Sequence, residues 1–96
     1  MTDGAAVVTA SSVLRFAPHA KFRFDETRGA WVILAPERLM LPDEQAVAVL
    51  KLVDGARDVD AIIDVLSREY EAPRDVIAAD VLPMLQDLSD KKVLRG

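Results

Sequence analysis

The spacing of apolar residues changes once along this chain, and that change limits the folds it can adopt. Between Lys21 and Leu41, polar and apolar residues alternate or form short β-branched runs, which is typical of strands. After Pro42 the apolar residues recur every three to four positions, as they do along amphipathic helices. Strands followed by helices indicate an α+β domain, in which the sheet and the helices each bury one apolar face against the other.

Three short strands are expected in the first half, separated by turn residues. The alternation places Phe22 and Phe24 toward the core, and Trp31 in the central strand is expected there as well. Consecutive strands joined by short turns pair in an antiparallel manner, so the sequence predicts a three-stranded antiparallel meander. The expected strands are Lys21–Asp25, Ala30–Leu34 and Arg38–Leu41.

Three helices are expected in the second half. Asp43 and Asp58 each precede an apolar stripe with helical spacing, where a carboxylate can cap the first turn. Pro73 suits the first position of the third helix, and Lys91 suits its negative end. The order of three strands and three helices predicts an α+β, winged-helix-like layout in which the wing comes first.

One domain accounts for the chain, because 96 residues leave room for a single core. Residues 1–12 are small and follow no sustained period, so we expect a flexible tail or a linker there. The folded domain is expected to cover residues 13–96.

The residues that most enzymes need are missing from the sequence. There is no cysteine, and the one histidine, His19, has no second ligand at metal-binding spacing. The four glycines form neither of the common phosphate-binding motifs. Most carboxylates are explained as helix caps or solvated faces, and Asp80 borders an apolar stripe, where we expect it to bond a nearby donor. We therefore expect no enzyme, no cofactor and no metal.

The class of partner is narrowed by charge and hydropathy. A net charge of −4 disfavours nucleic acid, whose phosphates are bound by clustered lysine and arginine. The sequence has no apolar run long enough to span a membrane and no export signal, so a cytoplasmic protein is expected. A peptide or protein partner fits this chain better.

An exposed strand edge offers a way to bind such a partner. The edge at Arg38–Leu41 would present free backbone groups to an incoming strand. If the third helix packs alongside it, strand and helix together form a groove for an extended peptide. Met40 and Met84 suit a groove or a core equally well.

Several short segments follow one another in a distinctive order and spacing. They are Pro18 with Lys21-Phe22-Arg23-Phe24, Pro36-Glu37-Arg38-Leu39, Leu50-Lys51-Leu52-Val53-Asp54-Gly55, Ala72-Pro73-Arg74, Asp80-Val81-Leu82 and Leu85-Gln86-Asp87-Leu88. This series resembles the PqqD family of pyrroloquinoline quinone (PQQ) biosynthesis, and the resemblance covers about Leu14 to Leu94.

The resemblance implies a winged helix-turn-helix recognition element for ribosomally made, modified peptides. Such a domain binds the leader of the precursor peptide PqqA beside its third strand and third helix. It presents that peptide to PqqE, a radical S-adenosylmethionine enzyme that joins a Glu and a Tyr, and carries no catalyst itself. Some relatives are fused to the enzyme PqqC, so residues 1–12 could be linker. The implied peptide contacts are Glu37, Arg38, Leu39, Met40, Leu41, Ile77, Asp80, Val81 and Met84.

Two positions depart from the family pattern, and two other functions stay open. Asp43 stands where asparagine is common, and Lys92 where a glycine often closes the third helix. One alternative is a structural or regulatory subunit that docks on a modifying enzyme without touching the peptide. The other is DNA binding through the third helix, which its three aspartates Asp75, Asp80 and Asp87 disfavour.

Overall fold

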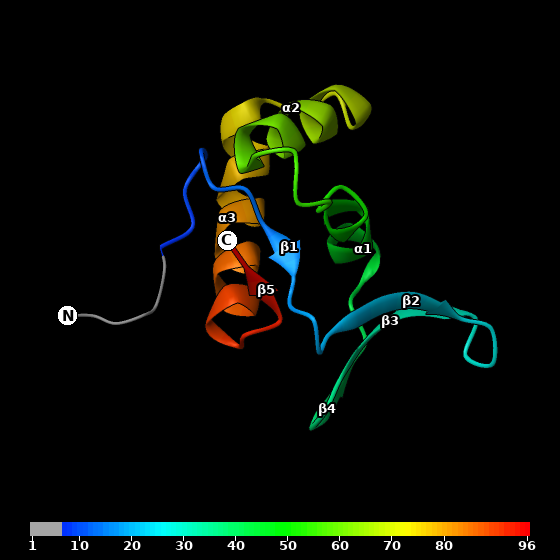
Figure 1. The fold of residues 1–96 in the computed structure, drawn as a ribbon. Coiled ribbons are helices and arrows are strands. Elements are labelled where there is room, and N and C mark those ends of the chain that lie inside the picture. The colour runs from blue at the N-terminus through cyan, green and yellow to red at the C-terminus, as the bar shows by residue number, and fades with distance from the viewer. Residues whose placement is uncertain (1–6) are drawn as a thin grey trace.

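The computed structural model describes residues 7–96 and contains three helices beside a projecting sheet (Figure 1). The sheet is antiparallel with the strand order β2-β3-β4, and the helices follow it in the chain, so the α+β winged-helix-like architecture is confirmed. These elements are β2 (Lys21–Asp25), β3 (Ala30–Ala35), β4 (Arg38–Met40), α1 (Glu44–Leu50), α2 (Val59–Glu69) and α3 (Arg74–Asp90).

The predicted aspartate caps are present at the first two helices. Asp43 accepts a hydrogen bond from the Ala46 N–H at 2.8 Å, and Asp58 accepts one from the Ala61 N–H at 2.8 Å. Each carboxylate satisfies a backbone donor that the first helical turn leaves without a partner. Pro73 differs slightly from the prediction, because it is the N-cap of α3 rather than its first helical residue.

The connection from α1 to α2 is a tight turn. Gly55 adopts a positive φ of 77°, which a glycine allows without steric cost. Asp54 accepts hydrogen bonds from the backbone N–H groups of Arg57 and Ala56, and these bonds hold the pKa of the Asp54 carboxyl below its usual value. α1 therefore stops at Leu50, and the apolar pattern that continues to Val53 lies in the turn.

A second, two-stranded sheet joins the two ends of the domain, and the sequence did not predict it. Strands β1 (Arg15–Phe16) and β5 (Leu94–Arg95) pair in an antiparallel manner (Figure 1). The Ala17 N–H also donates to the carbonyl of Val93 at 2.9 Å. Two-residue strands are too short to show alternation, so only the fold reveals them.

The core lies between the three helices and this small sheet. Its most buried side chains come from β3, all three helices and the C-terminal segment, so residues far apart in sequence close the same space. The largest side chains that are under 2 % exposed are Ile33, Leu50, Ile62, Leu85, Leu94, Val32, Val59 and Val93.

Part of the segment expected to be a tail packs against the helices. Val8 is 8 % exposed, and its backbone N–H donates to the Oε1 atom of Gln86 in α3 at 2.7 Å. The carbonyl of Ser12 accepts a hydrogen bond from the Val59 N–H at 2.9 Å. Residues from Val8 to Ser12 thus contact the folded part of the chain, and positions 1–6 of the expected tail or linker lie outside the described residues.

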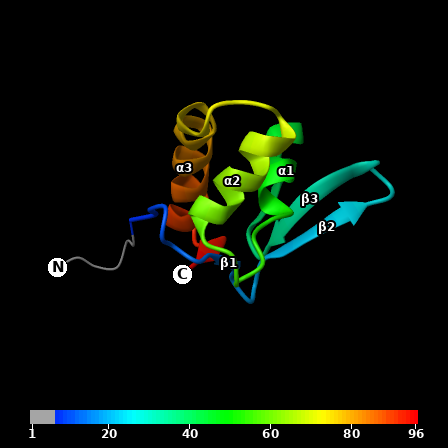
Figure 2. The same cartoon turned by 90° about the horizontal axis from the view of Figure 1, so that it is seen from above.

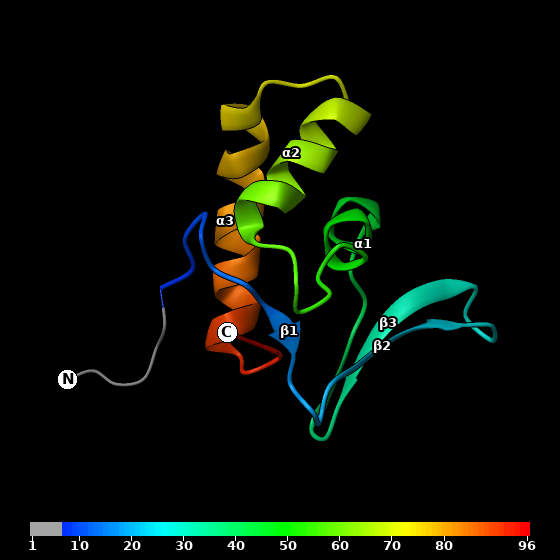
Figure 3. The same ribbon diagram turned by 45° about the horizontal axis from the view of Figure 1, so that its top comes forward.

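The hairpin of β2 and β3 extends past α1, and this corrects the predicted burial of its aromatic residues (Figures 2 and 3). Phe24 pairs with Trp31 near the hairpin's turn and is 45 % exposed, and Trp31 and Phe22 are half-buried. Alternation correctly placed Phe22, Phe24 and Trp31 on the face of the hairpin that also carries Ile33. The helices cover only the part of that face around Ile33. Hairpin length therefore decides which of these rings reach the core.

Lys92 adopts the conformation that a glycine would adopt at the end of α3. Its φ is 67°, and the Val93 N–H reaches back to the carbonyl of Leu88 at 3.0 Å, as in the common glycine-terminated helix end. The left-handed conformation costs a residue with a Cβ about 1–2 kcal/mol.

Replacing Lys92 by glycine is expected to stabilise the domain. Relief of this strain, less the entropy that glycine loses on folding, should raise the free energy of unfolding by about 0.5–1 kcal/mol. Urea unfolding followed by circular dichroism measures the difference. Lys91→Gly is the matched control: Lys91 has a φ of −82°, and glycine there should lower stability. A less stable Lys92→Gly variant would contradict the strain argument.

Candidate functional site

The open edge of the sheet is β4. It pairs with β3 through the registers Ile33↔Met40, Leu34↔Leu39 and Ala35↔Arg38, and no other strand of the described chain lies on its far side. Its outer row of N–H and C=O groups is thus available to an added strand. Met40 points to the side of Ile33 and packs against the core, whereas Leu39 is 42 % exposed on the opposite face.

A groove between α1 and α3 begins where β4 ends. One part of it is a cavity of about 320 Å³ that Asp43 and Ala46 line from one wall and Met84 from the other. A second part, of about 200 Å³, continues toward α2 and the start of α3. The two cavities share Gln45, Val49, Asp80 and Val81, so they form one continuous groove.

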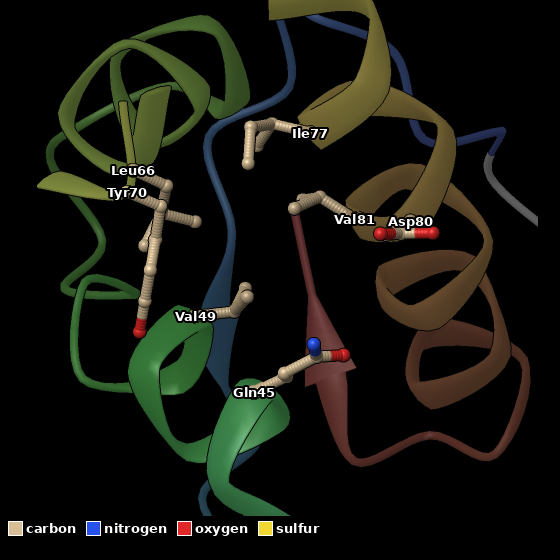
Figure 4. A pocket seen from close by; sticks show the side chains of 7 residues that line it. All are labelled: Gln45, Val49, Leu66, Tyr70, Ile77, Asp80 and Val81. Carbon is tan, nitrogen blue, oxygen red and sulfur yellow. The ribbon is translucent and has the colours of Figure 1, made fainter. Parts of the chain in front are cut away.

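The end of this groove near α2 is apolar. Figure 4 shows Ile77 and Val81 of α3 facing Val49 of α1 across the cavity, while Leu66 and Tyr70 close its α2 side. Gln45 and Asp80 supply its polar groups. An apolar wall with a few polar groups is the usual composition of a ligand pocket.

At the other end of β4, the β3–β4 turn approaches the end of α3. A cavity of about 450 Å³ there is lined by Pro36 and Glu37 from the turn, by Arg38 from β4 and by Lys91, the C-cap of α3. The segment from Arg38 to Asp43 thus lies near α3 at both of its ends, beside Lys91 at one end and beside Met84 at the other. The charged residues are Asp43 and Asp80 near the groove, and Glu37, Arg38 and Lys91 at the other end, where Lys91 pairs with Asp87.

The structure brings together part of the site expected from the sequence. All four helix residues, Ile77, Asp80, Val81 and Met84, line the α1–α3 groove. Of the five strand residues, Glu37 and Arg38 line the cavity beside Lys91, whereas Leu39, Met40 and Leu41 line none of these three cavities. The wall that faces α3 within the groove is α1, so the groove differs from the expected pairing of strand and helix alone.

Sequence reasoning missed the residues that α1 and α2 give to the groove. Val49 and Leu66 belong to apolar stripes, which do not distinguish a core position from a pocket wall. Tyr70 continues the apolar spacing of α2, but it is the C-cap of that helix and is 57 % exposed. Its phenol ring at the end of an apolar stripe is the one signal that could have suggested a pocket.

Residues 7–96 hold no group of three or more His, Cys, Asp or Glu side chains that could bind a metal ion. None of the helices described is long and apolar enough to cross a membrane.

Comparison with known proteins gives consistent results. Residues 30–94 match the family model of coenzyme PQQ synthesis protein D (PqqD). A PqqA binding protein of Rhodopseudomonas palustris (strain HaA2) is 63 % identical over 76 residues, which are 79 % of this chain and 74 % of that protein. A bifunctional coenzyme PQQ synthesis protein C/D of Methylorubrum extorquens is 49 % identical over 84 residues, 88 % of this chain and 23 % of that protein.

A solved structure extends the similarity to the fold. The solution structure of the PqqD part of Methylobacterium extorquens PqqCD has a TM-score of 0.78 and 46 % identity to this chain, over 93 % of this chain and 95 % of that one. That protein is a stand-alone recognition element for ribosomally synthesised, modified peptides. The fold, the family match and the relatives agree: this chain belongs to the PqqD family.

Proposed function

We propose that this chain binds a PqqA-type precursor peptide and presents it to a PqqE-type radical S-adenosylmethionine enzyme. The leader of the peptide adds as a strand to β4, and some of its side chains enter the groove between α1 and α3. The proposed contacts are Glu37 to Leu41 on the strand and Ile77, Asp80, Val81 and Met84 on the helix. The domain acts as a carrier without catalysing a reaction, and we expect it in the cytoplasm.

The observation that carries this proposal is the position of the open β4 edge at the mouth of an apolar groove. A peptide that pairs with β4 keeps its backbone groups hydrogen-bonded. A peptide that runs along β4 is directed toward Asp43 and the cavity at Met84. Alternate side chains of an added strand point to opposite faces, so every second one can turn toward α3.

The energetics require both parts of this arrangement. Each backbone hydrogen bond contributes about 0.5–1.5 kcal/mol net, while association costs at least ~4 kcal/mol. Strand pairing along the three residues of β4 is therefore insufficient for stable binding. One fully buried leucine- or phenylalanine-sized side chain adds about 1.5–3 kcal/mol, so an anchor in the groove makes the complex stable.

The dimensions of the groove suit one such anchor. Its end at α2 has a volume of about 200 Å³. An apolar cavity of roughly 150 Å³ is large enough for benzene. A leucine or aromatic side chain of the leader therefore fits between Val49, Ile77 and Val81.

The direct test is a titration of isotope-labelled protein with a synthetic PqqA-type peptide, followed through backbone amide shifts. We expect the shifts to concentrate on Arg38–Leu41 and on residues 77–88. No shifts at high peptide excess would favour a docking subunit that never contacts the peptide. Steeply salt-dependent binding of duplex DNA would instead favour the DNA-binding alternative.

Peptides methylated at single backbone nitrogens test the strand pairing. In an added strand, alternate N–H groups point toward β4, so methylation should weaken binding at every second residue. Loss of one bond corresponds to roughly 2- to 10-fold in affinity. Isothermal titration calorimetry of each peptide gives the pattern, and the intervening positions are the internal control. Equal affinities along the whole peptide would contradict pairing with β4.

A further inference from the structure

A row of aromatic rings lies along the β2–β3 hairpin at the other edge of the sheet. Phe16 stacks on Phe22 with ring centroids 5.4 Å apart, and Phe22 stacks on Trp31 at 4.8 Å. All three rings are half-buried and line an open hollow of about 610 Å³. The edge strand beside this hollow is β2, whereas the proposed peptide edge is β4.

The charged residues around this hollow are all basic. Lys21, Arg23 and Lys51 line it, all three are exposed, and no acidic side chain contributes to its wall. The Lys51 ammonium lies 4.9 Å from the centre of the Trp31 ring, within the range of a cation–π contact. None of the three forms an ion pair with a carboxylate of residues 7–96.

This clustering stands out because the chain as a whole is acidic, with a net charge of −4. Five of the nine other basic residues are paired with carboxylates, among them Arg28 with Asp25, Arg57 with Asp54 and Lys91 with Asp87. The three cations of the hollow lie beside half-buried aromatic rings. A carboxylate can approach them at little cost in free energy, because no existing ion pair has to be broken. Aromatic residues and arginine are also enriched where proteins bind each other.

We propose that this aromatic–basic surface, made of Phe16, Phe22, Trp31, Lys21, Arg23 and Lys51, docks an acidic segment of the peptide-modifying enzyme. The segment carries carboxylates that pair with the three cations and an apolar side chain that covers the exposed part of the rings. This inference rests on the proposed function and names the surface by which the carrier reaches its enzyme. Because β2 and β4 are opposite edges of one sheet, enzyme and peptide can be bound together.

Two other occupants fit the surface less well. Single-stranded nucleic acid also stacks on rings among cations, but its many phosphates would meet the acidic remainder of the chain. A second copy placed symmetrically on the same surface would bring its three cations against these three, which is repulsive. An acidic protein segment complements the surface without either cost.

The test uses the full chain and the PqqE-type enzyme, with the affinity for enzyme and for peptide measured separately by calorimetry. The double variant Lys21→Glu/Arg23→Glu should weaken enzyme binding by about tenfold or more and reduce its salt dependence. Its affinity for the PqqA-type peptide should stay unchanged. Arg95→Glu, which reverses an exposed cation outside this surface, is the matched control and should bind enzyme normally.

Trp31 gives a second readout, because it is the only tryptophan in the chain. A protein labelled with 5-fluorotryptophan has one fluorine signal, which should shift when enzyme is added and stay in place when peptide alone is added. Enzyme binding without a fluorine shift, or with full affinity in the double variant, would overturn the proposal.

The other possible outcomes show which partner occupies the aromatic–basic surface. An equal loss of peptide affinity in the double variant would make this surface part of the peptide site and refute the docking role. The proposal would also be overturned if wild-type protein bound an oligonucleotide and the variant did not. The same holds if wild-type protein formed a concentration-dependent dimer and the variant did not. Wild-type protein that binds peptide but no enzyme would refute docking and presentation, and would leave peptide binding supported.

Discussion

Replacing Met84 by glutamate is expected to remove measurable binding of a PqqA-type peptide while the domain stays folded. Met84 lines the groove between α1 and α3, and the charged residues that line the same cavity, Asp43 and Asp80, are both acidic. A bound apolar side chain would cover the new carboxylate without a cation to pair with it. Burying even a neutral polar group costs about 1–3 kcal/mol, or about 5- to 150-fold in affinity, and burying an unpaired carboxylate costs more.

The fold should tolerate this change, because Met84 is only half-buried and glutamate has nearly the same helix propensity as methionine. Val76→Glu is the matched control: Val76 lies on the same helix, is 51 % exposed and lines none of the three cavities beside β4 and α3. Met84→Leu should keep most of the affinity, since it conserves volume and polarity. Full peptide affinity in Met84→Glu would mean that the peptide does not use this groove.

Local sequence rules were sufficient for the elements themselves. The alternation at Lys21–Asp25 gave the bounds of β2, and the aspartates before α1 and α2 cap them as predicted. These features depend on neighbours within about four residues, so a single sequence contains the information. The resemblance to the PqqD family was recoverable for the same reason, because it rests on short segments in a fixed order.

Features that depend on distant residues were not recoverable. β1 and β5 exist only because the two ends of the domain meet, and neither segment shows a pattern of its own. The exposure of Phe24 depends on how far the hairpin projects past α1, which alternation does not determine. The segment at Val8 looks like linker in sequence and is held by a side chain in α3, almost eighty positions away.

The candidate groove shows the same limit. Its α3 wall was predictable because Ile77, Val81 and Met84 share one helical face. Its second wall was not, because the angle between helices decides whether an apolar stripe such as that of Val49 closes against its neighbour or leaves a cavity. The contribution of Tyr70 follows from where α2 ends, and that is set by packing rather than by the stripe.

Deleting residues 93–96 is expected to unfold the domain, although the deletion removes only four residues and none of the proposed site. Val93 and Leu94 are 1 % and 2 % exposed, and β5 supplies the strand that pairs with β1. Loss of two fully buried side chains amounts to about 3–6 kcal/mol. Small domains are stable by only about 5–15 kcal/mol, so this loss removes a large part of the free energy of unfolding, and all of it at the lower end of that range. Thermal unfolding followed by circular dichroism should show a Tm lower by at least about 15 °C, or no cooperative transition.

Two further variants show whether the buried residues cause this loss. A chain that ends at Leu94 lacks only the exposed Arg95 and Gly96 and should unfold close to the wild-type Tm. Leu94→Ala in the full chain should fall between the two, with a loss of about 2–5 kcal/mol. If the chain without residues 93–96 kept the wild-type Tm, the β1–β5 sheet would contribute nothing to stability. The wing and the helices would then fold without the pairing that joins the two ends of the domain.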